Sequence, residues 1–349
     1  MAHAIGWSAR RMAGDVVLVT GASGYIGSHV VANLLARGMH VRAAARDLGR
    51  TEHLQLLPVD DGGSLEVVSM DLFDTDSVNA AVAGCSDVIH TAAAVRVVAK
   101  NPQRDIVDPS VVGCQNLVAA IDAAGCVERF VHTSSTAAIS SSTFEDGRVF
   151  SNEDWCDDAS VKFNPYGLAK ASAERVVRDW HAQAKDPPRL VTIHPCVTFG
   201  PPMTRRHLRG SLSFIVALIN RNPPMVIPLH VNVVDVRDVA EAHVRALRGG
   251  QPGGRYLVVG GHAWMRDIAK ILEDEFPDQK WPRRQIPYSL ALLAALFHPK
   301  ITVSWARAHL RKRSFFDASP AERELGMEWR PIEESIIDTV HPILENDWI

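Results

Sequence analysis

The stretch that decides the fold is residues 16–46, VVLVTGASGYIGSHVVANLLARGMHVRAAAR. It opens with β-branched and apolar residues at 16–20, after which glycines recur at 21, 24 and 27. An apolar-periodic segment then covers 25–36, and Gly38 separates it from a second apolar run at 39–45. This order predicts a strand, a tight turn, a helix and a second strand, which together make one βαβ unit.

The glycine-rich turn has the spacing G-x-x-G-x-x-G. At a helix N-terminus, free N–H groups and the helix dipole attract an anion such as a pyrophosphate. A Cβ at the approach points would hold the phosphates away, so Gly21 and Gly24 permit close approach, and Gly27 lets the helix pack on the strand. The turn therefore predicts a dinucleotide-binding site, against the alternative of a plain strand–helix turn that binds nothing.

Composition excludes several classes of protein. The 349 residues are 46% hydrophobic and 22% charged, as in soluble globular proteins. A net charge of −3 gives no general attraction to nucleic acid or anionic membrane, so the basic runs at 205–207 and 311–313 are expected to be solvated. The most apolar later window, 288–297, is too short to span a bilayer. We expect neither a nucleic-acid nor a membrane partner.

The cysteines and histidines carry no metal or disulfide pattern. Five cysteines, an odd number, lack C-x-x-C spacing, and the fifteen histidines lack H-x-x-x-H and H-E-x-x-H. These patterns predict that the protein binds no metal and that it works in a reducing, cytoplasmic compartment. Residues 1–14, short and without an acid, are expected to be a disordered start.

Beyond the first unit, apolar runs keep alternating with helical patterns. Strands are expected at 65–69, 87–90 and 128–133, and helices at 75–82 and 108–124. Such alternation predicts an α/β fold, a Rossmann-type doubly wound parallel sheet with helices on both faces. Ligands of such sheets bind at the carboxyl ends of the strands.

We expect two regions. Residues 15–200 would form the nucleotide-binding domain, to which 231–247 would return, because Val231 to Asp235 reads as a strand directed toward the sheet. From Gly200 the alternation loosens, so 201–349 would mainly form a smaller, mostly helical substrate lobe.

The end of the second strand bears on the choice of cofactor. An NAD-preferring unit would place Asp or Glu there, but this chain has Ala45 and Arg46, with Arg42 nearby and no acid before Asp47. A guanidinium can bind a 2′-phosphate bidentately, which favours NADP(H) over the alternative of two solvated arginines. Asp71, after the third strand, could accept from an adenine amino group or could cap a helix.

The chemistry is expected on a helix that follows Pro165. Tyr166 and Lys170 are four residues apart and so share a helical face. A neighbouring ammonium favours the phenolate and lowers the pKa of a phenol, which makes tyrosine a usable general acid or base at a carbonyl. A hydroxyl from Ser134, Ser135 or Thr136 would hold the same oxygen. The alternative is a half-buried tyrosine beside a solvated lysine.

These motifs, T-G-A-S-G-Y-I-G, Asp71-Leu72, T-S-S and Y-G-L-A-K, resemble those of the extended short-chain dehydrogenases/reductases. V-R-A-A-A-R-D at 41–47, N-P-Q-R-D-I-V-D-P at 101–109 and H-P-C-V-T-F-G-P at 194–201 are similar to the dihydroflavonol-reductase-like branch, which includes dihydroflavonol, cinnamoyl-CoA and aldehyde reductases. The resemblance covers about 15–345.

The resemblance implies a catalytic triad of Ser135, Tyr166 and Lys170, with Lys170 also on the cofactor ribose. It implies further cofactor contacts from Gly21, Ser23, Gly24, Tyr25, Ile26, Gly27, Arg42, Arg46, Asp71, Leu72, Thr91, Ala92, Ala93, Pro195 and Val197. Two departures from the family pattern are Ser110, where many relatives have Asn, and His194, where many have Arg or Asn. For His194 a structural role is favoured.

The substrate cleft would lie between the two regions and would be mostly apolar. Its expected lining is Val95, Thr136, Thr198, Phe199, Met203 and Phe214, which suggests an uncharged or amphipathic carbonyl compound.

The function expected is NADPH-dependent reduction of an aldehyde or ketone, or the reverse, by a monomer or homodimer. The alternatives are an NAD-dependent sugar-nucleotide epimerase or dehydratase, a 3β-hydroxysteroid dehydrogenase-like enzyme, and a non-enzymatic NADP-sensing protein. Arg46 argues against the first of these, and the presence of both Tyr166 and Lys170 argues against the last.

Overall fold

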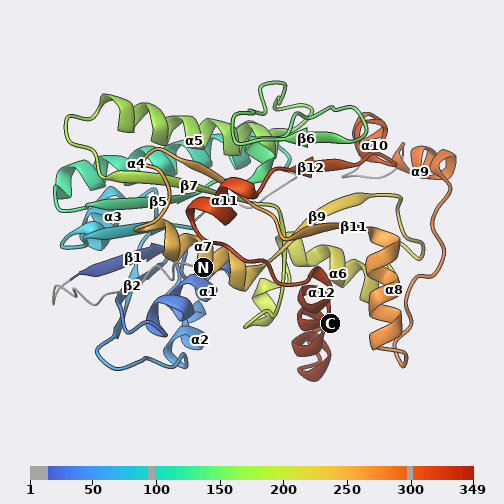
Figure 1. The fold of residues 1–349 in the computed structure, drawn as a ribbon, viewed down its shortest axis with the longest axis horizontal. Helices are drawn as coiled ribbons and strands as arrows, with labels where there is room; N and C mark the ends of the chain where they lie inside the picture. The colour runs from blue at the N-terminus through green and yellow to red at the C-terminus, as the bar shows by residue number, and fades with distance from the viewer. Residues whose placement is uncertain (1–14, 93–98, 297–301) are drawn as a thin grey trace.

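The computed structural model describes residues 15–92, 99–296 and 302–349 (Figure 1). Its main feature is a seven-stranded sheet of order β10-β7-β5-β4-β1-β2-β3, in which all neighbours are parallel. Its strands are β1 (Val16–Thr20), β2 (His40–Ala45), β3 (Ser64–Ser69), β4 (Asp87–His90), β5 (Arg129–Thr133), β7 (Arg189–Pro195) and β10 (Arg255–Val258). The expected doubly wound α/β fold is confirmed.

Helices cover both faces of this sheet (Figure 1). They include α1 (Tyr25–Leu35), α2 (Glu52–Gln55), α3 (Thr75–Val82), α4 (Asp108–Ala124), α5 (Pro165–Gln183), α7 (Val236–Ala246) and α11 (Ser319–Glu324). On one face α3, α4 and α5 bury apolar side chains against Leu18, Val88 and Phe130. On the other, α1, α7 and α11 pack against Val17 and Val19. Burial of these apolar stripes on both sides is what holds a parallel sheet together.

Local signals explain where the helices begin and end. Asp74 caps α3 by accepting from the N–H groups of Asp76 and Ser77. Gly125 ends α4 in the left-handed region at φ 61°. Asn164 caps α5, where its Oδ1 accepts from Gly167 N at 2.9 Å. These are short-range effects, which is why the sequence predicted α3 and α4 at their observed bounds.

A second body of structure follows β7, with its own apolar core. It holds a three-stranded sheet of order β11-β9-β8, made of β8 (Val197–Phe199), β9 (His230–Asp235) and β11 (Gly261–Trp264). Its helices are α6 (Ser213–Ile219), α8 (Met265–Glu275), α9 (Tyr288–Ala295), α10 (Val303–His309) and α12 (Ile332–Glu345). A two-stranded pair joins β6 (Arg148–Phe150) to β12 (Ser314–Phe316). None of the described helices is long and apolar enough to cross a membrane.

Two expectations about this region need correction. The strand expected to return toward the main sheet, β9, pairs instead with β8 and β11. What does return is α7, which shares the core of α1. Conversely β10, from the range given to the substrate lobe, is an edge strand of the main sheet beside β7. An apolar run shows that a strand forms but not which strand it pairs with. The disordered start expected at 1–14 lies outside the described residues.

Candidate active site

The glycine-rich turn joins β1 to α1 in a tightly packed arrangement. Gly21 has φ +66°, and a Cβ added there would lie 2.7 Å from Ala92 Cα. A Cβ on Gly27 would lie 2.8 Å from Thr91 Oγ1. No side chain caps the N-terminus of α1, so its first-turn N–H groups face the carboxyl edge of the sheet without a side-chain acceptor. Gly21 and Gly27 are thus required by packing against Ala92 and Thr91, and the uncapped N–H groups of α1 are what fits a pyrophosphate.

Two other residues of the turn, Ser23 and Tyr25, are held by the second region. The Tyr25 hydroxyl donates to Gly200 O at 2.7 Å, and burial raises the pKa of this phenol well above its ordinary value. Its side chain therefore anchors the turn, and only its backbone is available for a phosphate. The Ser23 carbonyl lies 3.3 Å from His207 Nε2, and Ile26 packs against the core beneath.

The two arginines expected at the 2′-phosphate lie at different ends of the sheet. Arg46 follows β2 at the carboxyl edge and is exposed. Arg42 lies within β2, where its Nε donates to Glu66 Oε2 at 2.7 Å and its Nη1 to Ala83 O at 2.7 Å. Ala83 precedes β4, so the Arg42 guanidinium points to the amino edge. The expectation for Arg42 is therefore corrected: the structure does not bring it to the cofactor.

The remaining cofactor positions lie at the carboxyl ends of β3 and β4. Asp71 Oδ1 accepts from Phe73 N at 3.0 Å, and Leu72 O accepts from Asn116 Nδ2 at 2.7 Å. Thr91 Oγ1 donates to Thr20 O at 2.7 Å, which places Ala92 beside the glycine turn. These bonds fix the Asp71 carboxylate and the Leu72 carbonyl in place. Ala93 and Val95 lie outside the described residues.

The start of α5 carries the expected catalytic pair. Tyr166 is half-buried, and Lys170, one turn later, is only 9% exposed. The Lys170 ammonium donates to Thr133 O at 3.3 Å, at the last residue of β5. The helix face that carries both residues therefore lies against the strand end that carries the candidate hydroxyls.

The three candidate hydroxyls differ in their partners. Ser134 is buried and donates to Glu174 Oε2 at 2.7 Å, which commits it to the interior. Thr136 is also buried, with Oγ1 3.4 Å from Pro195 O. Ser135 is less buried, and its Oγ makes only a long contact of 3.4 Å to Pro195 O while it accepts from Ala137 N at 3.2 Å. Ser135 is thus the hydroxyl that is best placed to turn toward a substrate oxygen.

The residues expected to line the substrate cleft divide into two groups. Met203 and Phe214 are partly exposed. Phe199 is 0% exposed within the second core, and Thr198 is buried with its Oγ1 donating to Cys196 O at 3.1 Å. The structure buries the side chains of both Thr198 and Phe199, so the expectation that these two line the cleft is corrected.

The two departures from the family pattern have local partners. The Ser110 hydroxyl donates at 2.8 Å to Ile106 O, in the π-helical turn (Gln103–Val107) that leads into α4. His194 is fully buried, with Nε2 2.8 Å from Glu174 Oε2, in agreement with the structural role favoured for it. Sequence reasoning missed Glu174, although its position four residues after Lys170 places both on one face of α5.

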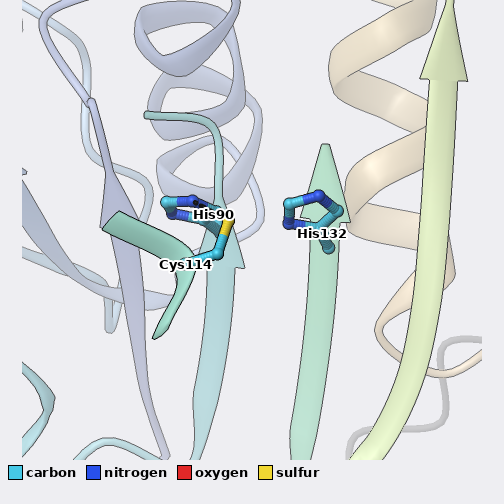
Figure 2. A group of neighbouring side chains, drawn as sticks. All are labelled: His90, Cys114 and His132. Atoms are coloured by element: carbon cyan, nitrogen blue, oxygen red, sulfur yellow. Dashed lines mark hydrogen bonds between the residues drawn. The ribbon is translucent and has the colours of Figure 1, made fainter. Parts of the chain in front are cut away.

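Two histidines and a cysteine, His90, His132 and Cys114, form a buried group (Figure 2), and Lys170 is close enough to influence them electrostatically. His90 and His132 are register partners on β4 and β5, and Cys114 Sγ lies 3.8 Å from His90 Nε2. Residue spacing did not reveal this group, because its members come from three different elements. They are ligand types that soft metals use.

The geometry of this group does not favour a metal ion. The two imidazole rings stack with planes 24° apart, so their in-plane lone pairs do not converge on one point. His90 Nδ1 is already 2.7 Å from Thr20 Oγ1. Burial, and then the charge of Lys170, lowers the pKa of His90 to about 3, so a further cation at this place would be repelled by the lysine. We assign no metal to the group.

Comparisons with known proteins show which family the chain belongs to. The model of the family described as "NAD dependent epimerase/dehydratase family" matches residues 17–260. Cinnamoyl-CoA reductase CAD2 of Medicago truncatula is 29% identical over 345 residues, covering 95% of this chain and 96% of the relative. Dihydroflavonol 4-reductase of Zea mays is 31% identical over 280 residues, covering 77% of this chain and 76% of the relative.

A solved structure shares the fold over nearly the whole chain. Yeast methylglyoxal/isovaleraldehyde reductase Gre2, complexed with NADPH, matches with a TM-score of 0.77 at 25% identity, covering 95% of this chain and 99% of that one. From the family match and these relatives, the chain belongs to the NAD-dependent epimerase/dehydratase family, the extended short-chain dehydrogenases/reductases, and is an NAD(P)-dependent reductase of its dihydroflavonol-reductase-like branch.

Proposed function

We propose that this chain reduces an aldehyde or ketone with NADPH, using Tyr166 as the general acid, Ser135 as the hydroxyl that holds the carbonyl oxygen, and Lys170 as the cation beside them. The observation that carries the proposal is the placement of Lys170. It is a buried ammonium on the same helical face as Tyr166, and it donates to the carbonyl of the residue that precedes the Ser134–Ser135 pair.

The residues at the carboxyl edge suit an NADP cofactor. The first-turn N–H groups of α1 and Gly21, Gly24 and Gly27 would hold its pyrophosphate. Arg46, exposed at the end of β2, would bind its 2′-phosphate. NADPH supplies a hydride to the carbonyl carbon when bound. Pro195 and Val197, which follow directly along β7 and β8, would flank the nicotinamide.

The protein's own part in the reaction is proton transfer and charge stabilisation. Tyr166 would donate its phenolic proton to the substrate oxygen, and Lys170 would stabilise the phenolate that remains. Ser135 would donate a hydrogen bond to the same oxygen, which gains negative charge in the transition state. In the reverse direction Tyr166 would accept the proton from an alcohol.

The substrate is proposed to be an uncharged or amphipathic carbonyl compound, because Met203 and Phe214, two of the residues expected to line the cleft, are apolar and partly exposed. The relatives named above include reductases of a thioester, a flavonoid and small aldehydes, so the size of the substrate is left open. All five cysteines are free thiols, which supports a reducing, cytoplasmic location.

Replacement of the acid tests the proposal. Tyr166→Phe should lower kcat by about 100-fold or more, since a positioned acid contributes that much, while NADPH affinity stays near that of the wild type. Tyr288→Phe is the matched control, because Tyr288 lies on α9 with its ring beneath Arg311. Activity of Tyr166→Phe within a few-fold of the wild type would show that another group is the acid. NAD that copurifies tightly and is not consumed would instead favour a sugar-nucleotide epimerase.

A further inference from the structure

Glu174 is a buried carboxylate on the same helix as the catalytic pair. It follows Lys170 by four residues and Tyr166 by eight, so all three lie on one face of α5. Its side chain is 0% exposed. A charge in this position is costly unless each oxygen is fully hydrogen-bonded. Its partners therefore show what this carboxylate does.

Both oxygens of Glu174 are engaged. Oε2 lies 2.7 Å from the Ser134 hydroxyl and 2.8 Å from His194 Nε2. Oε1 accepts from Arg178 Nε at 2.9 Å and from Arg255 Nε at 2.8 Å. These partners come from the end of β5, from β7, from β10 and from α5 itself.

The surroundings keep this carboxylate ionised. Burial alone would raise the pKa of the Glu174 carboxyl, but His194 and Arg255 outweigh it and hold that pKa well below its ordinary value. Burial lowers the pKa of the His194 imidazole, and its Nε2 lies within hydrogen-bonding distance of Glu174 Oε2. Arg255 is held in turn by the carbonyls of Asn152 and Asp154 and stacks on Trp155 at 3.9 Å. Both oxygens of Glu174 are therefore fully paired.

The two contacts of Glu174 Oε2 hold Ser134 and His194, and each of these residues directly precedes a residue of the proposed site. Ser134 directly precedes Ser135, and His194 directly precedes Pro195, whose carbonyl contacts Ser135 Oγ at 3.4 Å. The backbone between them is joined as well, since Ser134 N donates to Ile193 O at 2.8 Å. Glu174 thus ties the helix that carries Tyr166 to both strand ends that frame the substrate oxygen.

We propose that Glu174 is a positioning residue for Ser135, which acts through Ser134 and holds the end of β5 at a fixed place against Tyr166 and Lys170. The inference rests on the proposed function, in which Ser135 is the hydroxyl that binds the carbonyl. If Glu174 only stabilised the fold, removal of the Ser134 hydroxyl would cost stability without a specific effect on Ser135.

The sharpest variant is Ser134→Ala. It removes one donor while Glu174 keeps His194, Arg178 and Arg255, so the fold is retained. Ser335→Ala is the matched control, because Ser335 is an equally buried serine on α12, whose hydroxyl donates to Pro331 O at 3.3 Å.

Hydrogen exchange tests the positioning role without any substrate. The N–H groups of Ser134 and Ala138 are bonded to Ile193 O and Ser135 O, and that of Ala137 to Ser135 Oγ. In Ser134→Ala these amides should exchange about tenfold faster, while those of β1 keep their wild-type rates. Ser335→Ala should leave both segments unchanged. Wild-type exchange at 134–138 in Ser134→Ala would overturn the proposal.

A double-mutant cycle tests the link to Ser135. Ser134→Ala should lower kcat about tenfold with an unchanged Kd for NADPH, whereas Ser135→Ala should lower kcat about 100-fold. In the Ser135→Ala background, Ser134→Ala should add less than about twofold, because its effect runs through a hydroxyl that is already absent. Effects that multiply would overturn the proposal. A wild-type protein that reduces no carbonyl would refute the proposed function, while the exchange experiment would still decide the role of Glu174.

Discussion

Gly27 offers a direct test of how tightly the cofactor turn is packed. A Cβ at this position would lie 2.8 Å from Thr91 Oγ1 and closer still to the Gly21 carbonyl oxygen. Neither atom can yield easily, since Gly21 O accepts from Gly24 N at 2.9 Å and Thr91 Oγ1 donates to Thr20 O at 2.7 Å. Gly27→Ala must therefore displace the turn itself.

The size of the effect follows from this displacement. Overpacking costs about 1–3 kcal/mol, against a gain of up to about 1 kcal/mol in helix propensity, so stability should fall by up to about 3 kcal/mol. Loss of one backbone hydrogen bond to a charged pyrophosphate costs about 1.5–3 kcal/mol, which corresponds to about a 10- to 150-fold weaker Kd for NADPH.

The assay combines denaturant unfolding with a fluorescence titration of NADPH. Gly260→Ala is the control, because a Cβ there would meet no atom closer than 3.5 Å, and it should change stability by less than about 0.5 kcal/mol. If Gly27→Ala bound NADPH with wild-type affinity and unfolded at the wild-type denaturant concentration, the reasoning about close approach at this turn would be refuted.

Two further predictions concern the cofactor preference and the pH dependence of stability. Arg46→Ala should weaken NADPH binding by about 10- to 150-fold, because one charged hydrogen-bonding group contributes about 1.5–3 kcal/mol, and it should leave the affinity for NADH unchanged. The control variant Arg42→Ala should leave both affinities unchanged. Equal effects of the two variants in a binding titration would contradict the assignment of Arg46 to the 2′-phosphate. Burial lowers the pKa of His243 to about 4 from an ordinary 6.5. Between these pH values the folded state therefore binds fewer protons than the unfolded state. The free energy of unfolding is thus highest above pH 6.5 and decreases as the pH falls toward 4. When the pH is lowered from 6.5 to 4, the free energy of unfolding of His243→Gln should therefore decrease by about 3 kcal/mol less than that of the wild type. Denaturant unfolding measures both, and an equal decrease in the two proteins would contradict the prediction.

The sequence predicted the parts of the fold that depend on neighbours in the chain. The glycine turn, the Asp74 cap and the stop at Gly125 are local signals, and the structure has each of them where it was expected. The pairing of Tyr166 with Lys170 on one helical face also follows from spacing alone. Periodicity and capping act over a few residues, so one chain suffices to predict them.

Features set by packing across elements could not be predicted in the same way. Arg42 was expected at the phosphate because it is close to Arg46 in sequence, but its cross-strand neighbour Glu66 and the carbonyls before β4 draw it to the opposite edge. Phe199 was expected in the cleft, but the pairing of β8 with β9 turns it into the second core. The Glu174 network, too, joins residues from four elements whose proximity no spacing rule gives.

The central claim is tested most directly by mixing the purified protein with NADPH, and separately with NADH, and following oxidation of the nicotinamide against a panel of aldehydes, ketones, dihydroflavonols and acyl-CoA thioesters. The account predicts that NADPH is consumed in proportion to the carbonyl reduced. It also predicts that NADH is used far less well, because NADH has no 2′-phosphate for Arg46 to bind. If the protein bound NADPH but no compound of the panel caused NADPH to be oxidised, the account would be contradicted.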